Sequence, residues 1–243
     1  MGKVNLNRFS EMLSNLGQNE SASMGFGSKH ERTKVPVMVL VGEQMDDSVQ
    51  EHANAYLSHG IHPDNKKIWG IFGSNIKSVG WKKIKKAGCQ FVIFDSYDAP
   101  ADILLEENIS KGMLIDDVES DSRTRAIEDT ALDFLVFRPP TDSFPLNFGS
   151  TLKLQEVVST YSKHILLYLE STPDKKDLDI LKEIPISGIV VNLSKIKGVK
   201  LKRLFENIQK LKPKKNSREQ RPLIPGGQGI DYQTDFEEEE VED

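Results

Sequence analysis

The stretch KKAGCQFVIFDSYDAPADILLEENISKGMLIDDVESDSRTRAIEDTALDFLVFRPP (residues 85–140) contains the same pattern three times. A short apolar run, FVIF, MLI or FLVF, ends in a polar or charged residue, and a segment of helical composition separates it from the next run. Short apolar runs that alternate with helical segments are typical of βα units and of a parallel sheet buried on both faces. The stretch therefore predicts an α/β fold.

The pattern continues on both sides of this stretch, and it predicts a (β/α)8 TIM-like barrel. Seven runs are clear, and a short extended piece at Ser23–Gly27 is expected to supply an eighth, degenerate first unit. The segment DDSVQEHANAYLSHG (46–60) is predicted to be a helix that ends at Gly60. A doubly wound parallel sheet is the alternative architecture. The four further runs are VPVMVLVGE (35–43), IWGIFGSN (68–75), HILLYLES (164–171) and GIVVNLS (188–194).

The chain is expected to have three parts. Residues 1–22 form an N-terminal helix and a linker, because apolar residues within 4–16 recur at helical spacing. Residues 23–213 form the TIM-like α/β barrel domain. Residues 214–243 form a charged C-terminal tail, which is predicted to be disordered because it is rich in Pro, Gly and charged residues.

The charge of the chain is unevenly distributed. The net charge is −5, but residues 231–243 carry eight acidic groups and no basic one, so the rest of the chain has a net charge of +3. Residues 195–221 hold eleven Lys or Arg. Nucleic-acid binding there is ranked lowest, because the segment has one aromatic residue, lacks a recognition motif and reads in its first half as an amphipathic helix. A protein partner that binds the tail is considered instead.

Features that the sequence lacks limit the possible cellular location and partners of the protein. The single cysteine, Cys89, cannot form an intramolecular disulfide and is expected to be a small packing residue. A cytoplasmic location is therefore predicted. No apolar run approaches the roughly 20 residues of a membrane span, so no membrane partner is expected. The five histidines are not expected to be catalytic, and the motifs of serine hydrolases, paired cysteines and EF-hands do not occur.

The polar residues that follow the apolar runs are the main functional candidates, because a closed barrel brings them to one mouth. Asp95, Asp116 and Glu170 are predicted to be catalytic residues and ligands of Mg²⁺ or Mn²⁺, which prefer oxygen donors. Arg138 is predicted to clamp an anion. These residues favour a metal-assisted lyase or isomerase that acts on a small carboxylate or phosphate metabolite. Asn192 and Ser194 are expected to bind substrate, while Glu43 and Asp117 are weaker candidates.

A structural interpretation of the same residues stays open. Asp and Ser directly after a strand commonly cap the following helix. Asp116 and Arg138 can equally be a structural ion pair. The chain would then be a non-catalytic binding or scaffold protein that interacts through its charged tail. The geometry of the mouth discriminates the two, because an enzyme needs the strand ends to share one site.

The order of elements resembles an uncharacterised set of bacterial TIM-barrel-like proteins. The resemblance covers most of residues 20–225 and implies the barrel fold, but it implies no activity. Compared with aldolase-type barrels, no strand is expected to contain a lysine for a Schiff base, and the chain lacks a Gly-rich phosphate loop. The segments that carry the resemblance are MGFG (24–27), KKAGCQFVIFDS (85–96), LLEENISKGMLIDDVESDSRTRAIEDTALDFLVF (104–137) and ISGIVVNLS (186–194).

Overall fold

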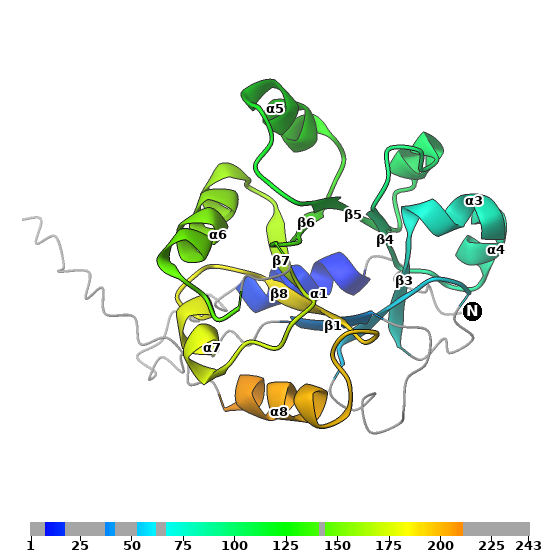
Figure 1. Ribbon diagram of the computed structural model, residues 1–243. Coiled ribbons are helices and arrows are strands. Elements are labelled where there is room, and N and C mark those ends of the chain that lie inside the picture. Colours follow the sequence, from blue (N-terminus) through cyan, green and yellow to red (C-terminus); the bar gives the residue numbers. More distant parts are fainter. Residues whose placement is uncertain (1–7, 18–36, 42–52, 62–66, 141–143, 211–243) are drawn as a thin grey trace, which may run out of the picture.

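Eight parallel strands close into a barrel in the computed structural model of the protein (Figure 1). Residues 8–17, 37–41, 53–61, 67–140 and 144–210 are described. Each strand pairs with the next along the chain, and the last strand pairs with the first from Val37↔Gly188 to Val41↔Asn192. The predicted TIM-like barrel is therefore confirmed. The strands are β1 (Val37–Val41), β2 (Ala55–Ser58), β3 (Ile68–Phe72), β4 (Phe91–Phe94), β5 (Ser110–Ile115), β6 (Phe134–Phe137), β7 (His164–Leu169) and β8 (Gly188–Asn192).

Helical segments follow most strands and cover the outside of the barrel (Figure 1). Both faces of the sheet are thus buried, as parallel strands require. The outward strand residues and the apolar faces of these helices form one core cluster, which includes Trp69, Leu135 and Leu167. The helical elements are α1 (Arg8–Gly17), η1 (Gly73–Asn75), α3 (Ile76–Val79), α4 (Trp81–Lys86), η2 (Ala101–Leu105), α5 (Asp121–Asp129), α6 (Phe148–Thr160), α7 (Lys175–Leu181) and α8 (Gly198–Gln209).

One strand corrects the sequence-based prediction. Residues 55–58, expected at the end of a helix, form β2 and pair with β1 and β3. All four residues of β2 are buried. A strand completely enclosed in a parallel sheet needs apolar side chains on both faces, which Ala55, Tyr56 and Leu57 supply. The extended piece predicted at Ser23–Gly27 lies outside the described residues.

The barrel interior is filled by side chains, and two glycines make room for two aromatic rings. A Cβ atom on Gly70 would lie 2.4 Å from the ring of Phe91, and one on Gly112 would lie 2.1 Å from the ring of Phe134. Both distances are far below van der Waals contact. The rings of Phe91 and Phe134 therefore occupy space that only glycine leaves open on the neighbouring strand.

The N-terminal helix α1 belongs to the core of the barrel. Phe9 and Leu13 are fully buried, and Phe9 stacks on Phe91 at 4.2 Å between ring centroids. The backbone N–H of Ser10 donates to Ser110 Oγ at 3.0 Å. Phe91 and Ser110 are the first residues of β4 and β5, so α1 fills the N-terminal end of the barrel. The C-terminal ends of the strands form the mouth at the opposite end.

The last described helix is amphipathic, as predicted. Leu201, Leu204, Phe205 and Ile208 of α8 are buried, whereas Val199 is 84% exposed. The basic side chains of α8 are exposed. The tail, predicted for residues 214–243, lies outside the described residues. Among the described residues, no helix has the length and apolar character that crossing a membrane demands.

Candidate functional site

The C-terminal ends of β5, β6, β7 and β8 bring most of the predicted site residues together. Alternation along each strand points every second side chain into the barrel. The inward series is Gly112 and Leu114 on β5, Val136 on β6 and Leu166 on β7. The same alternation puts Asp116, Arg138, Glu170 and Asn192 at the mouth.

Arg138 and Asp116 form a bidentate ion pair at this mouth. Arg138 Nε donates to Asp116 Oδ1 at 2.7 Å, and Nη2 donates to Oδ2 at 2.9 Å. The backbone N–H of Arg138 still donates to Ile115 at 2.9 Å, which keeps the two residues side by side. Pro139 and Pro140 follow and end β6, because proline cannot donate to a ladder. The pair raises the pKa of Arg138, so its guanidinium stays charged.

Tyr168 continues this row of side chains onto β7. The register between β6 and β7 ends at Phe137↔Leu167, so the next residues, Arg138 and Tyr168, face each other. Tyr168 is 8% exposed. Burial is the main cause that raises its pKa, and the charge of Glu170 adds to it. The phenol is therefore protonated at neutral pH.

A chain of hydrogen bonds fixes the direction in which Tyr168 can donate. The backbone N–H and the hydroxyl of Ser194 both donate to Asn192 Oδ1, at 2.9 and 2.6 Å. Asn192 Nδ2 then donates to the Tyr168 hydroxyl at 2.9 Å. The amide orientation is set by the Ser194 backbone N–H, which can only donate. The Tyr168 oxygen is an acceptor in this chain, so its own proton is directed elsewhere.

Glu170 lies close to both cationic and phenolic groups. It follows Tyr168 by two residues and so continues the same face of β7, and its charge raises the pKa of Arg138 and of Tyr168. It is half-buried and lies opposite Asn192, one step beyond the last paired residues of β7 and β8, Leu169 and Val191. Of the predicted site residues, Asp116, Arg138, Glu170, Asn192 and Ser194 thus gather on one side of the mouth.

Asp95 is engaged elsewhere, on the β3–β4 side. Its two carboxylate oxygens accept hydrogen bonds from the backbone N–H and the hydroxyl of Ser74, at 2.9 and 2.7 Å. Ser74 lies in η1, directly after β3. Asp95 thus secures the turn between β3 and α3. Glu43 lies outside the described residues.

The carboxylates do not fit the predicted Mg²⁺ or Mn²⁺ site. Within the part of the chain that the structure describes, no three His, Cys, Asp or Glu side chains are arranged to hold a metal ion. Asp116 is bound by Arg138, and Asp95 is bound by Ser74. A cation at Asp116 would have to displace the guanidinium, so no step of the chemistry below uses a metal.

Helix capping explains few of the strand-end residues. Helix α6 is capped by Asn147, which accepts from the Ser150 backbone N–H, and α7 is capped by Asp174 in a capping box with Asp177. Ser120 precedes α5 but makes no side-chain cap bond. Asp117 instead pairs with Lys153 of α6, which lowers the pKa of Asp117. Asp116 caps no described helix.

Tyr168 is the mouth residue that sequence reasoning missed. It lies inside the apolar run HILLYLES, where an aromatic residue is expected to be a buried core residue. The available signal was its position two residues before Glu170, on the same face of the strand. His59 was also set aside, yet it lies directly after β2, with its Nδ1 3.3 Å from Asn75 Nδ2.

The fold is shared with tryptophan synthase alpha subunits. The structure from Campylobacter jejuni has a TM-score of 0.52 at 14% identity, covering 76% of this chain and 98% of that chain. The A-subunit of Pyrococcus furiosus has a TM-score of 0.51 at 12% identity, covering 73% and 97%. Tryptophan synthase from M. tuberculosis has a TM-score of 0.53 at 9% identity, covering 84% and 96%.

Structural matches at identities this low show that the barrel fold is shared, but they do not show a shared function. The function must therefore be argued from the residues of the site. No protein-family model matches the chain, and no curated protein is significantly similar in sequence.

Proposed function

We propose that the barrel mouth binds a small anionic metabolite, a carboxylate or a phosphate, and carries out acid–base chemistry of the lyase or isomerase type. The observation that carries the proposal is the row formed by Asp116, Arg138 and Tyr168. The side chains of Asp116 and Arg138 are 64% and 41% exposed. An ion pair this exposed contributes only about 0–1 kcal/mol to the free energy of unfolding, so stabilising the fold does not explain well why the pair is present.

Arg138 is suited to hold the anion. A guanidinium has five N–H donors in a planar fork, and Asp116 engages two of them. The bidentate contact fixes the plane of the fork, and the other donors can bind a carboxylate or phosphate without further ordering. In this assignment Asp116 is a positioning residue, because it acts through Arg138.

Glu170 and Tyr168 are suited to move protons. Glu170 would act as the general base that removes a proton from carbon next to the bound carboxylate or carbonyl. The Tyr168 hydroxyl would donate a hydrogen bond to the oxygen on which negative charge develops. Its raised pKa keeps that proton in place at neutral pH. Asn192 and Ser194 would position the Tyr168 oxygen.

The barrel fold is compatible with this proposal. Active sites of TIM-barrel enzymes lie at the C-terminal ends of the strands, where this row lies. The tryptophan synthase alpha subunits with the same fold are enzyme subunits, and one of the similar structures is a tryptophan synthase complex. A protein partner and a cytoplasmic location remain part of the proposal, the latter supported by the single, buried, free thiol of Cys89.

A non-catalytic binding protein is the second candidate function. It is favoured by the same ion pair, because the carboxylate of Asp116 already occupies the position where a ligand carboxylate would bind Arg138. The mouth would then be closed by its own side chains. The two candidates differ in whether an external anion binds and whether a proton on carbon is exchanged.

Anion binding is tested by thermal unfolding with phosphate or malonate. A ligand that binds only the folded state stabilises it by about 2.7 kcal/mol at about 100 times its Kd. We expect the melting temperature of the wild type and of Arg125→Gln to rise, because Arg125 is an exposed arginine of α5. Arg138→Gln should not respond. Equal responses in all three proteins would contradict the proposal.

Acid–base chemistry is tested by NMR in deuterium oxide with a panel of hydroxy- and oxo-carboxylates and sugar phosphates. We expect the wild type to replace a C–H hydrogen by deuterium in one compound class. Glu170→Gln should lose the exchange while it still binds phosphate or malonate. Absence of both anion binding and exchange would favour the non-catalytic protein, and anion binding without exchange in any compound would contradict the acid–base chemistry.

A further inference from the structure

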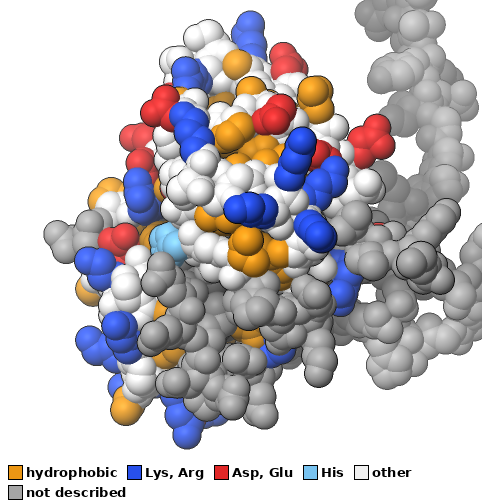
Figure 2. Space-filling view, turned by 90° about the vertical axis from the view of Figure 1, so that its right-hand side faces the viewer, with side chains coloured by type: hydrophobic (Ala, Val, Ile, Leu, Met, Phe, Trp, Pro, Cys, Tyr) orange, Lys and Arg blue, Asp and Glu red, His pale blue; other side chains and the backbone are white. Residues whose placement is uncertain are grey.

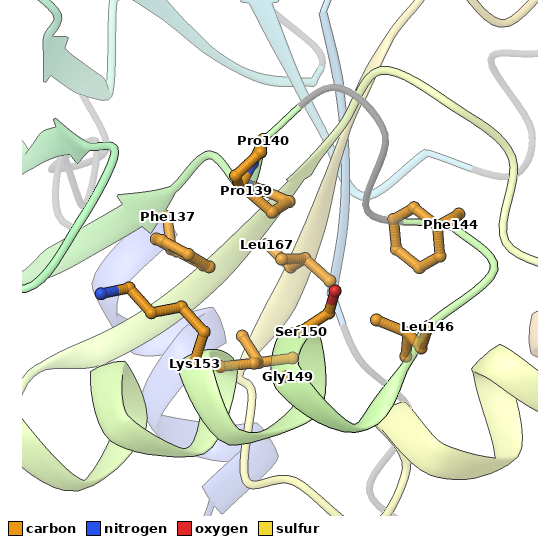
Figure 3. A pocket seen from close by; sticks show the side chains of 10 residues that line it. Phe137, Pro139, Pro140, Phe144, Leu146, Gly149, Ser150, Lys153 and Leu167 are labelled. Atoms are coloured by element: carbon orange, nitrogen blue, oxygen red, sulfur yellow. The ribbon is translucent and has the colours of Figure 1, made fainter.

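We propose that a pocket between β6, β7 and the first turn of α6 binds a small uncharged molecule with two rings, an aromatic alcohol by class. The pocket lies outside the barrel, between the outer face of the sheet and α6, and the proposal is independent of the function proposed above. Its floor is formed by Phe137 and Leu167, each 1% exposed, and Leu154 also lines it. Phe144 lies on the side opposite Phe137 (Figure 3).

The pocket exists because α6 begins with two small residues. Farther along the helix, Leu154 and Val157 fill the space above the sheet and are buried. In the first turn, Gly149 and Ser150 leave that space open. Backbone geometry does not require glycine there, because Gly149 has no positive φ and an added Cβ would meet only Asn147 Oδ1, at 3.3 Å. A larger side chain at Gly149 would require the Asn147 side chain to shift by only a few tenths of an ångström, so the cavity is a feature of this sequence.

The size of the cavity indicates a two-ring ligand. Its volume is about 290 Å³. A cavity of about 150 Å³ lined by Leu, Ile and Phe stays dry and binds benzene, so this pocket has room for roughly twice that group. Pro140 and Gly149 line it and are themselves exposed, so both belong to its rim. Aromatic and proline faces at floor and rim favour a flat ring system.

The charge of the lining indicates an uncharged ligand. Among the described residues that line the pocket, Lys153 is the only charged one, and its ammonium group pairs with Asp117 and with Glu156, the latter at 3.4 Å. Figure 3 shows the Lys153 amino group directed away from Phe144 and Leu146, so the pocket receives its aliphatic stem. A ligand carboxylate in this apolar cavity would have no cation available to pair with, and burying an unpaired charge costs free energy.

One hydroxyl supplies the polar contact. Ser150 points from α6 toward Leu167 (Figure 3), and its Oγ has no hydrogen-bond partner among the described residues. A ligand hydroxyl at this point can both donate to and accept from Ser150. The combination of an apolar cavity with a single hydroxyl matches an aromatic alcohol better than a hydrocarbon or an acid.

The proposal is tested by calorimetric titration with 2-naphthol and, as its charged counterpart, 2-naphthoate. We expect 2-naphthol to bind the wild type at least tenfold more tightly than 2-naphthoate. Ser150→Leu fills the cavity and should raise the Kd for 2-naphthol at least tenfold. Gln155→Leu adds the same side chain to the exposed face of α6 and should leave the Kd unchanged.

Three further measurements keep the test decisive. Gly149→Leu narrows the opening without touching Ser150 and should weaken binding also, which covers a folding defect in Ser150→Leu. Methyl resonances of Leu154 and Leu167 should shift on titration of the wild type, and Arg138→Gln should bind 2-naphthol as the wild type does. Absence of 2-naphthol binding, equal binding by the filled variants, or equal affinity for 2-naphthoate would overturn the proposal.

Discussion

Tyr168 is the residue whose protonation the proposed chemistry depends on. Burial and the charge of Glu170 raise its pKa, while the hydrogen bond from Asn192 and the charge of Arg138 lower it, and the raising causes prevail. We therefore expect Tyr168 to remain protonated beyond the usual tyrosine pKa of about 10. Glu170→Gln removes one raising cause, so the pKa of Tyr168 should fall toward its usual value.

The measurement is NMR of protein labelled with ¹³C at the tyrosine ring carbon that bears the hydroxyl, with Tyr168→Phe to assign the signal. Glu156→Gln, an exposed change on α6, is the matched control and should leave the titration of Tyr168 unchanged. A titration that is the same in the wild type and in Glu170→Gln would mean that Glu170 lies too far from Tyr168 to act with it.

Gly112 tests the packing of the barrel interior. In Gly112→Ala the new methyl group would lie 2.1 Å from the ring of Phe134, which is buried between α1 and the strands and has little room to move. Overpacking of this kind costs about 1–3 kcal/mol. Urea denaturation should show that loss, whereas Gly60→Ala, where a Cβ meets nothing within 4 Å, should keep the wild-type stability or exceed it slightly.

Residue chemistry decided which parts of the site could be predicted. Asp116 and Arg138 follow apolar runs and carry charges that need partners, so the sequence indicated both and even their pairing. Tyr168 was missed because an aromatic side chain is equally at home in a core. The roles of Asp95 and Asp116 differ only through register, since Ser74 faces one and Arg138 faces the other. Register across strands is not visible in one sequence.

Helix α1 closes the N-terminal end of the barrel mainly through Phe9. Its ring stacks on Phe91 at 4.2 Å and meets Phe134 edge-on at 5.1 Å. Truncating a fully buried phenylalanine costs about 3–5 kcal/mol, so Phe9→Ala should lose that much in urea denaturation. Arg8→Ala, an exposed neighbour in the same turn, should lose little. Equal stabilities of the two variants would show that α1 does not pack into the barrel in solution.

Lys163 joins the end of α5 to the start of β7. Its ammonium group donates to the carbonyls of Glu128, Thr130 and Leu132, at 3.0, 3.2 and 3.1 Å. A charged donor at a helix C-terminus satisfies carbonyls that the helix itself leaves open. Lys163→Met keeps the aliphatic stem but removes the donor, and should destabilise the protein by about 1–3 kcal/mol. The exposed Lys86→Met should be nearly neutral in the same denaturation experiment.

Strands could be predicted from the sequence where both the length and the composition of an apolar run were typical of a buried strand. Seven runs with β-branched and aromatic residues became strands, because few other structures bury such runs on both faces. Strand β2 was missed because Ala55–Ser58 is only four residues long, lacks β-branched side chains and ends in a residue pair, His59–Gly60, that resembles a helix end. Its pairing with β1 and β3 overrides that local preference, since a barrel with a missing strand would expose two edges.

At the scale of the whole molecule, two charged regions of opposite sign lie close in the sequence. Helix α8 exposes Lys200, Lys202 and Arg203, and Lys and Arg are spread over the face on the α3–α4 side (Figure 2). The acidic residues of 231–243 turn a net charge of +3 into −5. A dispersed basic surface without a recognition motif binds polyanions through charge alone, and such binding weakens steeply with salt.

Removing residues 231–243 should therefore raise affinity for polyanions. We expect the shortened protein to elute from a heparin column at clearly higher salt than the full chain, because the acidic segment offsets the basic surface. Replacing the eight acidic residues by Asn and Gln should reproduce the effect, and a tail with the acidic residues in shuffled order should behave as the wild type, since the interaction depends on charge. If all four proteins elute together, the tail does not shield the basic surface, and a protein partner becomes the better explanation of its charge.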